Sequence, residues 1–98
     1  MTIEEIGQKI SPLLKKYDVE YAGVFGSVAR GEDTIASDID LLVKFQQPLG
    51  MFTFIHLENE LTRVLDKKVD LATEQSLHRL IKKNVLRDLR ICYGKHKS

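Results

Sequence analysis

Several features are scarce in this chain of 98 residues, and each scarcity argues against a class of structure or partner. There is one cysteine, Cys92, so no disulfide can form within the chain, and we expect a reducing, cytoplasmic setting. Excess charge is also missing, because 15 basic residues nearly balance 14 acidic ones and leave a formal net charge of +1. This balance requires neither a nucleic acid nor a membrane as a partner, and we expect neither.

Long apolar runs are missing too, since none approaches the length that spans a membrane. The first residues, Met1 to Glu5, are polar and acidic, unlike the basic and apolar start of a signal peptide. The length predicts a single domain over residues 1–98, with one hydrophobic core and little more. A composition of 43% hydrophobic and 30% charged residues is that of an ordinary globular protein.

The spacing of apolar residues predicts the order of helices and strands. The first helix covers residues 3–17, where Thr2 and Glu5 match a capping box and Pro12 should kink or restart the helix. A short helix should follow Gly26-Ser27. Strands are predicted at residues 19–25, 39–45 and 69–72, and further helices at residues 51–65 and 77–92. This order predicts an α/β (α+β) fold, in which a small mixed three-stranded sheet is flanked by helices that cover one face.

Asp38 and Asp40 stand two residues apart at the start of the second predicted strand, so their side chains point to one face. The residues that follow are strongly apolar, and two like charges side by side on a buried strand are costly unless a cation lies between them. Mg²⁺ suits this position because it binds carboxylate oxygens and leaves room for water and phosphate oxygens. The alternative is a solvated strand end where acids happen to cluster, and the pair alone favours that alternative.

Gly26 and Ser27 lie where the first predicted strand passes into the short helix. Such a junction presents backbone N–H groups and the positive end of a helix to an anion. Gly26 lets the backbone approach a phosphate closely, and Ser27 adds a hydroxyl donor. Taken alone, a glycine turn with a serine cap is the better interpretation. Beside Asp38 and Asp40, however, the pair predicts a site for a metal-bound triphosphate, which needs both a phosphate site and a metal site.

Asp70 is a lone acid in the short apolar run Val69–Ala72. An exposed acid at a strand end is its ordinary interpretation. If its strand lies beside the strand of Asp38, three carboxylates converge, and three acids can hold two Mg²⁺ ions for in-line phosphoryl displacement. Asp70 would then hold the ion that lowers the pKa of the attacking hydroxyl, and it could accept the proton.

The combination of Gly26-Ser27, the pair Asp38-x-Asp40 and a third acid at Asp70 resembles the signature of the DNA polymerase β-like nucleotidyltransferases. The similarity is closer to the minimal, prokaryotic branch, the minimal nucleotidyltransferases, and covers nearly the whole chain. It implies a triphosphate site at Gly26 and Ser27, and two Mg²⁺ ions, with Mn²⁺ as an alternative, at the three acids. It also implies transfer of a nucleoside monophosphate, AMP from ATP, to a hydroxyl group.

Two features stay open at this point. Arg30, in the helix after the glycine turn, either reaches a phosphate or pairs with Glu32 or Asp33. The last predicted helix also has a basic face, for which a solvated surface is the favoured interpretation and a dock for an acidic partner or RNA the alternative. The residues of this face are Arg79, Lys82, Lys83, Arg87 and Arg90.

The resemblance also implies a partner. Members of this branch are often encoded beside a small all-helical protein of the HEPN type, and the pair resembles a type VII toxin–antitoxin system with the transferase as antitoxin. Few residues remain for an acceptor-binding domain, so we expect the HEPN-type partner to supply the hydroxyl and its own docking surface. The alternatives are a non-catalytic cap on the toxin, which would not need the acids, and transfer to a small molecule. The base, the acceptor and any homo-oligomer do not follow from the sequence.

Overall fold

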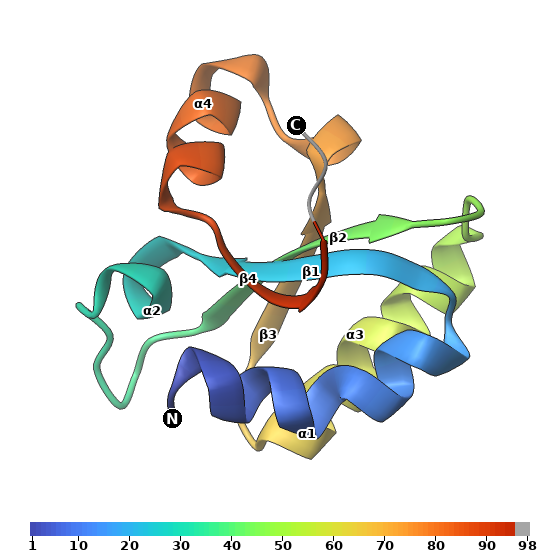
Figure 1. The fold of residues 1–98 in the computed structure, drawn as a ribbon, viewed down its shortest axis with the longest axis horizontal. Coiled ribbons are helices and arrows are strands. Elements are labelled where there is room, and N and C mark those ends of the chain that lie inside the picture. The colour runs from blue at the N-terminus through green and yellow to red at the C-terminus, as the bar shows by residue number, and fades with distance from the viewer. Residues whose placement is uncertain (96–98) are drawn as a thin grey trace.

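The computed structural model describes residues 1–95 and contains a four-stranded sheet with helices on both sides (Figure 1). The strand order is β3-β2-β1-β4; β1 runs antiparallel to β2 and β4, whereas β2 and β3 are parallel. The predicted mixed sheet is confirmed, but it has four strands and not three. The elements are α1 (Ile3–Lys16), β1 (Val19–Phe25), α2 (Gly26–Arg30), β2 (Ile39–Phe45), α3 (Met51–Leu65), β3 (Val69–Thr73), the 3-10 helix η1 (Glu74–Ser76), α4 (Arg79–Asp88) and β4 (Arg90–Gly94).

The fourth strand corrects the last predicted helix, which was placed at residues 77–92. α4 begins later because His78 caps it, with Nδ1 accepting a hydrogen bond from the Leu80 N–H at 3.1 Å. It ends earlier because Leu89 adopts extended backbone angles, φ −62° and ψ 129°. The chain then forms β4 at the edge of the sheet beside β1. This pairing joins segments about 70 residues apart, so local apolar spacing carries no sign of it.

α1 begins as predicted, with a capping box. The Thr2 hydroxyl accepts from the Glu5 N–H and the Glu5 carboxylate accepts from the Thr2 N–H, each at 3.0 Å. The predicted restart at Pro12 is wrong, because α1 is one helix from Ile3 to Lys16 with Pro12 inside it. Pro12 and Gln8 are both exposed, so the carbonyl that loses its helical donor at Pro12 faces water.

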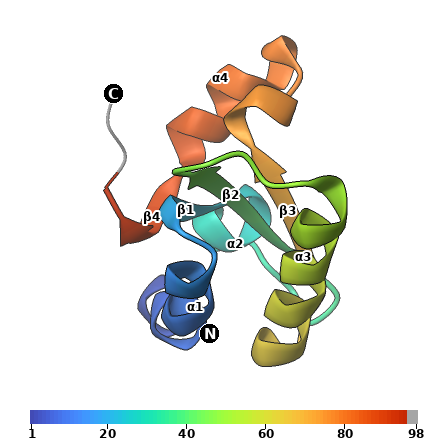
Figure 2. The ribbon, with the colours of Figure 1, turned by 90° about the vertical axis from the view of Figure 1, so that its right-hand side faces the viewer.

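The main hydrophobic core lies between one face of the sheet and helices α1 and α3, which run side by side beneath it (Figures 1 and 2). In β2, Ile39, Leu41 and Val43 alternate onto this face and are almost fully buried. Leu57 and Leu61 of α3 are also fully buried, and each such leucine stabilises the fold by about 1.5–3 kcal/mol. The core therefore fixes which face of β2 is left for polar residues.

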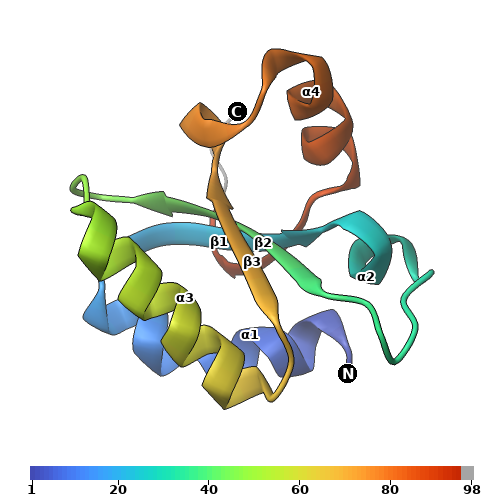
Figure 3. The ribbon, with the colours of Figure 1, turned by 180° about the vertical axis from the view of Figure 1, so that it is seen from behind.

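The opposite face of the sheet carries α4, which lies on the other side from α1 and α3 (Figures 1 and 3). Val85 of α4 packs there with Tyr21 of β1 and Leu42 of β2 in a second, smaller apolar cluster. The prediction that helices cover one face only is therefore wrong. Since side chains alternate along β2, Asp40 lies on the same face as Leu42. Within residues 1–95, no helix has both the length and the apolar character needed to cross a bilayer.

Candidate active site

The register of the sheet brings the three predicted acids together. Asp40 of β2 and Asp70 of β3 are direct partners across the parallel pair, so their side chains leave the sheet on one face. Asp38 comes just before β2. Its carboxylate lies 3.9 Å from the Lys68 ammonium group, which is also 3.9 Å from the carboxylate of Asp70. The predicted neighbourhood of the strands that carry Asp40 and Asp70 is thus present, and both residues lie on the face that also carries α4.

Asp40 is partly buried beside the other two acids, and this environment opposes its negative charge. Burial raises the pKa of its carboxyl above the ordinary value, and the negative charges of Asp70 and Asp38 raise it further. The nearby cation of Arg30 acts in the opposite direction and lowers the pKa. The three acids therefore interact electrostatically, which favours either a proton or a metal ion among them.

Gly26 lies directly against Asp40. Phe25, the last residue of β1, is the partner of Asp40 in β2, and Gly26 follows as the first residue of α2 with a left-handed φ of 74°. A Cβ atom at Gly26 would overlap the Asp40 Oδ2, so only glycine fits at this conformation and this distance. Ser27 lies in the first turn of α2, whose N-terminus receives no side-chain cap. The predicted phosphate site and the predicted metal site are therefore adjacent.

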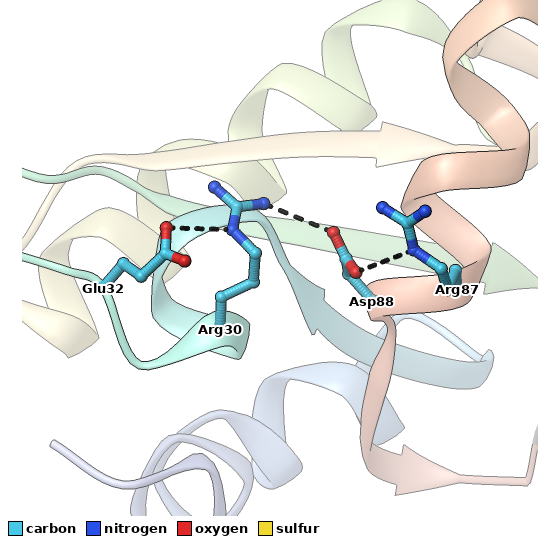
Figure 4. A network of polar contacts seen from close by, with 4 residues as sticks. All are labelled: Arg30, Glu32, Arg87 and Asp88. Atoms are coloured by element: carbon cyan, nitrogen blue, oxygen red, sulfur yellow. Dashed lines mark hydrogen bonds and ion pairs between the residues drawn. The ribbon is translucent and has the colours of Figure 1, made fainter.

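Arg30 pairs with acids on both sides (Figure 4). Its Nε lies 3.3 Å from Glu32 Oε2, and its Nη1 lies 3.3 Å from Asp88 Oδ2 at the end of α4. The other oxygen of Asp88 pairs with the Nε of Arg87 at 3.4 Å. Pairing with Glu32, one of the two alternatives for Arg30, is thus present, while phosphate binding by Arg30 stays a prediction. Asp88 was missed, because it is 58 residues from Arg30 and nothing in its local sequence marks it.

Lys68 was also missed, although its place two residues before Asp70 could have drawn notice. It ends the turn between α3 and β3, and its carbonyl oxygen accepts a hydrogen bond from the Ile39 N–H at 2.9 Å. This bond holds the backbone of Lys68 at the start of β2, between Asp38 and Asp40. The pairing of β2 with β3 therefore holds the backbone of Lys68 beside the acids.

The acids suit a divalent cation by their chemistry, but their side chains must turn to coordinate one. Carboxylate oxygens are the ligands that Mg²⁺ prefers, and burial together with the charges of Asp70 and Asp38 disfavours the charged form of Asp40 unless a cation binds, which raises its pKa. In the described part of the chain, no three acidic, histidine or cysteine side chains converge on a single ion position. The side chains of Asp38 and Asp70 are 42% and 50% exposed, so they can rotate without disturbing the core.

Asp40→Asn should be at least as stable as the parent protein in EDTA at pH 7, with a gain of up to about 1 kcal/mol. The folded state raises the pKa of Asp40, so its charge destabilises the fold above the titration range, whereas below about pH 4 both states are protonated and the penalty disappears. The gain should therefore appear in thermal melts at pH 7 and shrink in acid. A clear loss of stability at pH 7 would show that Asp40 is held by attractive contacts.

Comparisons with known proteins identify the family of this chain. The family described as "Polymerase beta, Nucleotidyltransferase" matches residues 8–98. A candidate protein adenylyltransferase of Methanocaldococcus jannaschii, MJ0435, is 43% identical over 88 residues, which cover 90% of this chain and 95% of that protein. The protein adenylyltransferase MntA of Thermococcus cleftensis is 39% identical over 93 residues, covering 91% and 94%.

A solved structure is similar as well. The crystal structure of a toxin–antitoxin with AMP-PNP superimposes with a TM-score of 0.79 and 26% identity, over 91% of this chain and 73% of that one. The matched family covers almost the whole chain, and the two relatives share about two fifths of its residues over nearly their full lengths. This chain therefore belongs to the polymerase β nucleotidyltransferase family of enzymes, as its Gly-Ser and Asp-x-Asp signature indicated.

Proposed function

We propose that this enzyme transfers AMP from ATP to a hydroxyl group of a small all-helical HEPN-type protein, and so acts as the antitoxin of a type VII toxin–antitoxin pair. The observation that carries the proposal is the contact between the Gly26 turn and Asp40, with Asp70 as the register partner of Asp40. The naming of relatives as protein adenylyltransferases supports AMP as the transferred group and a protein as acceptor. The similar toxin–antitoxin structure with AMP-PNP supports the nucleotide and the kind of partner.

Gly26 and Ser27 are proposed to bind the triphosphate. The first N–H groups of a helix have no partner within the helix, and no side chain caps α2. They can therefore donate to phosphate oxygens, and the Ser27 hydroxyl can donate beside them. Arg30 adds positive charge near the end of this short helix, where Glu32 and Asp88 orient it. We assign it to the nucleotide site on that basis.

Asp38, Asp40 and Asp70 are proposed to bind the metal, as two Mg²⁺ or Mn²⁺ ions. When bound, these ions would offset the phosphate charge and lower the pKa of the acceptor hydroxyl. The hydroxyl oxygen forms a bond to the α-phosphorus, the bond from that phosphorus to the bridging oxygen breaks, and pyrophosphate leaves. Asp70 has a half-exposed side chain on the outer strand β3, so it can meet an acceptor from outside and take the hydroxyl proton.

The proposal is tested by the mass of the partner protein. Incubated with Mg-ATP and a small all-helical HEPN-type partner protein, this enzyme should add one or more AMP units to that protein, as measured by intact-mass spectrometry. With ATP alone, turnover should be very slow, because no hydroxyl is held in line with the α-phosphate. The control reaction contains EDTA and should show no addition. If the mass stays unchanged while Mg-ATP is bound, the non-catalytic cap becomes the better account.

A further inference from the structure

Lys68 supplies the ion pairs of two of the three acids. Within residues 1–95, the ion pairs formed by Asp38 and by Asp70 both go to the ammonium group of Lys68, at 3.9 Å each. This distance is longer than the 2.7–2.9 Å, roughly, of a charge-assisted hydrogen bond, so the attraction is mainly between charges. The Lys68 side chain is 70% exposed. An exposed pair of this kind is weak, and its cation can leave at little cost.

The backbone of Lys68 is held in place beside β2, whereas its side chain can move away from the acids. The hydrogen bond from the Ile39 N–H to the Lys68 carbonyl fixes the residue beside the start of β2. The adjacent residue, Lys67, behaves differently, since its ammonium group donates to the backbone carbonyl of Thr34 at 3.3 Å. Two neighbouring lysines are thus placed at the same turn, but one bridges the acids and the other ties down a loop.

We propose that Lys68 is an internal counter-cation of the active site, which bridges Asp38 and Asp70 in the metal-free protein and competes with the divalent ion for their oxygens. The inference rests on the metal site of the proposed function. A single charge held between two carboxylates offsets part of their mutual repulsion, so the acids can be held together before an ion arrives. The same charge repels an incoming divalent ion at short range. Metal binding without nucleotide is therefore weakened, and the ion binds best together with the triphosphate.

The test is a calorimetric titration of the protein with Mn²⁺ alone, in the absence of nucleotide. Lys68→Met should bind Mn²⁺ about three- to tenfold more tightly than the parent, because a repelling charge a few ångströms away is removed and solvent screens part of the effect. Lys68→Arg, which keeps the charge, should bind like the parent. Lys67→Met is the matched control and should change the affinity less than twofold, since it removes a neighbouring charge that does not bridge the acids.

A second measurement is thermal melting in EDTA. Lys68→Met should melt a few degrees below the parent, and saturating Mn²⁺ should raise its melting temperature more than that of the parent. Lys68→Gln provides a second neutral variant if the methionine variant folds poorly. If the parent binds Mn²⁺ and the neutral variants bind it with equal or weaker affinity, the proposed role of Lys68 is wrong, but the proposed metal site is not. A parent protein that binds no Mn²⁺ would instead overturn the proposed metal site together with this inference.

Discussion

Asp70→Asn should lower the rate of AMP transfer by about 10²–10⁴-fold while most of the affinity for Mg-ATP remains. Asp70 lies on the edge strand β3 with a half-exposed side chain, where an acceptor hydroxyl can reach it. An amide in its place cannot accept the hydroxyl proton and is a weaker metal ligand. The substitution therefore slows the attack of the acceptor oxygen, whereas binding of the triphosphate is largely kept.

Asp40→Asn should lose both transfer and nucleotide binding. Asp40 lies between the Gly26 turn and Asp70, so its charge serves the triphosphate and the attacking oxygen together. Calorimetry with Mg-ATP measures the loss of nucleotide binding, and single-turnover kinetics measure the loss of transfer. Asp66→Asn is a suitable control, because Asp66 is exposed at the end of α3 in a left-handed conformation that asparagine also adopts. Equal loss of Mg-ATP affinity in Asp40→Asn and Asp70→Asn would contradict the separate roles given to these acids.

Gly26→Ala should destabilise the fold by about 1–3 kcal/mol and remove most nucleotide binding. The residue has a φ of 74°, which is strained for alanine, and the new Cβ would overlap the Asp40 carboxylate. Asp40 is a short side chain on a central strand, so it can move aside only by leaving its place beside the phosphate site. One substitution therefore disturbs the nucleotide site and the metal site at once.

Gly31→Ala separates these two causes. Gly31 has nearly the same φ, 72°, but a Cβ atom there would meet nothing within 4 Å. This variant should show the conformational strain alone, with Mg-ATP affinity close to that of the parent. Denaturant unfolding and calorimetry on both variants give the comparison. If Gly31→Ala loses as much stability and as much affinity as Gly26→Ala, the contact between residue 26 and Asp40 is not the cause.

Much of the fold was predictable where local rules are strong. The capping box at Thr2 and Glu5 and the apolar stripe of α3 depend on residues within two helical turns of each other, so they can be read along the chain. β4 could not be predicted in this way. An edge strand is defined by its pairing with a distant strand, here β1, and a short apolar stretch after a helix fits either structure.

The sequence by itself determined the chemistry of the site: a glycine turn, a pair of acids at a strand start and a third acid on a later strand. Only the tertiary structure decided how these parts meet. The parallel register of β2 and β3 makes Asp40 and Asp70 partners, and the same pairing fixes Lys68 beside Asp38. Asp88 reaches Arg30 because α4 packs on the sheet face that carries the acids. Residue types and spacing record which groups are available. Burial and the distances between charges depend on contacts between segments far apart in the chain, and together they raise the pKa of Asp40.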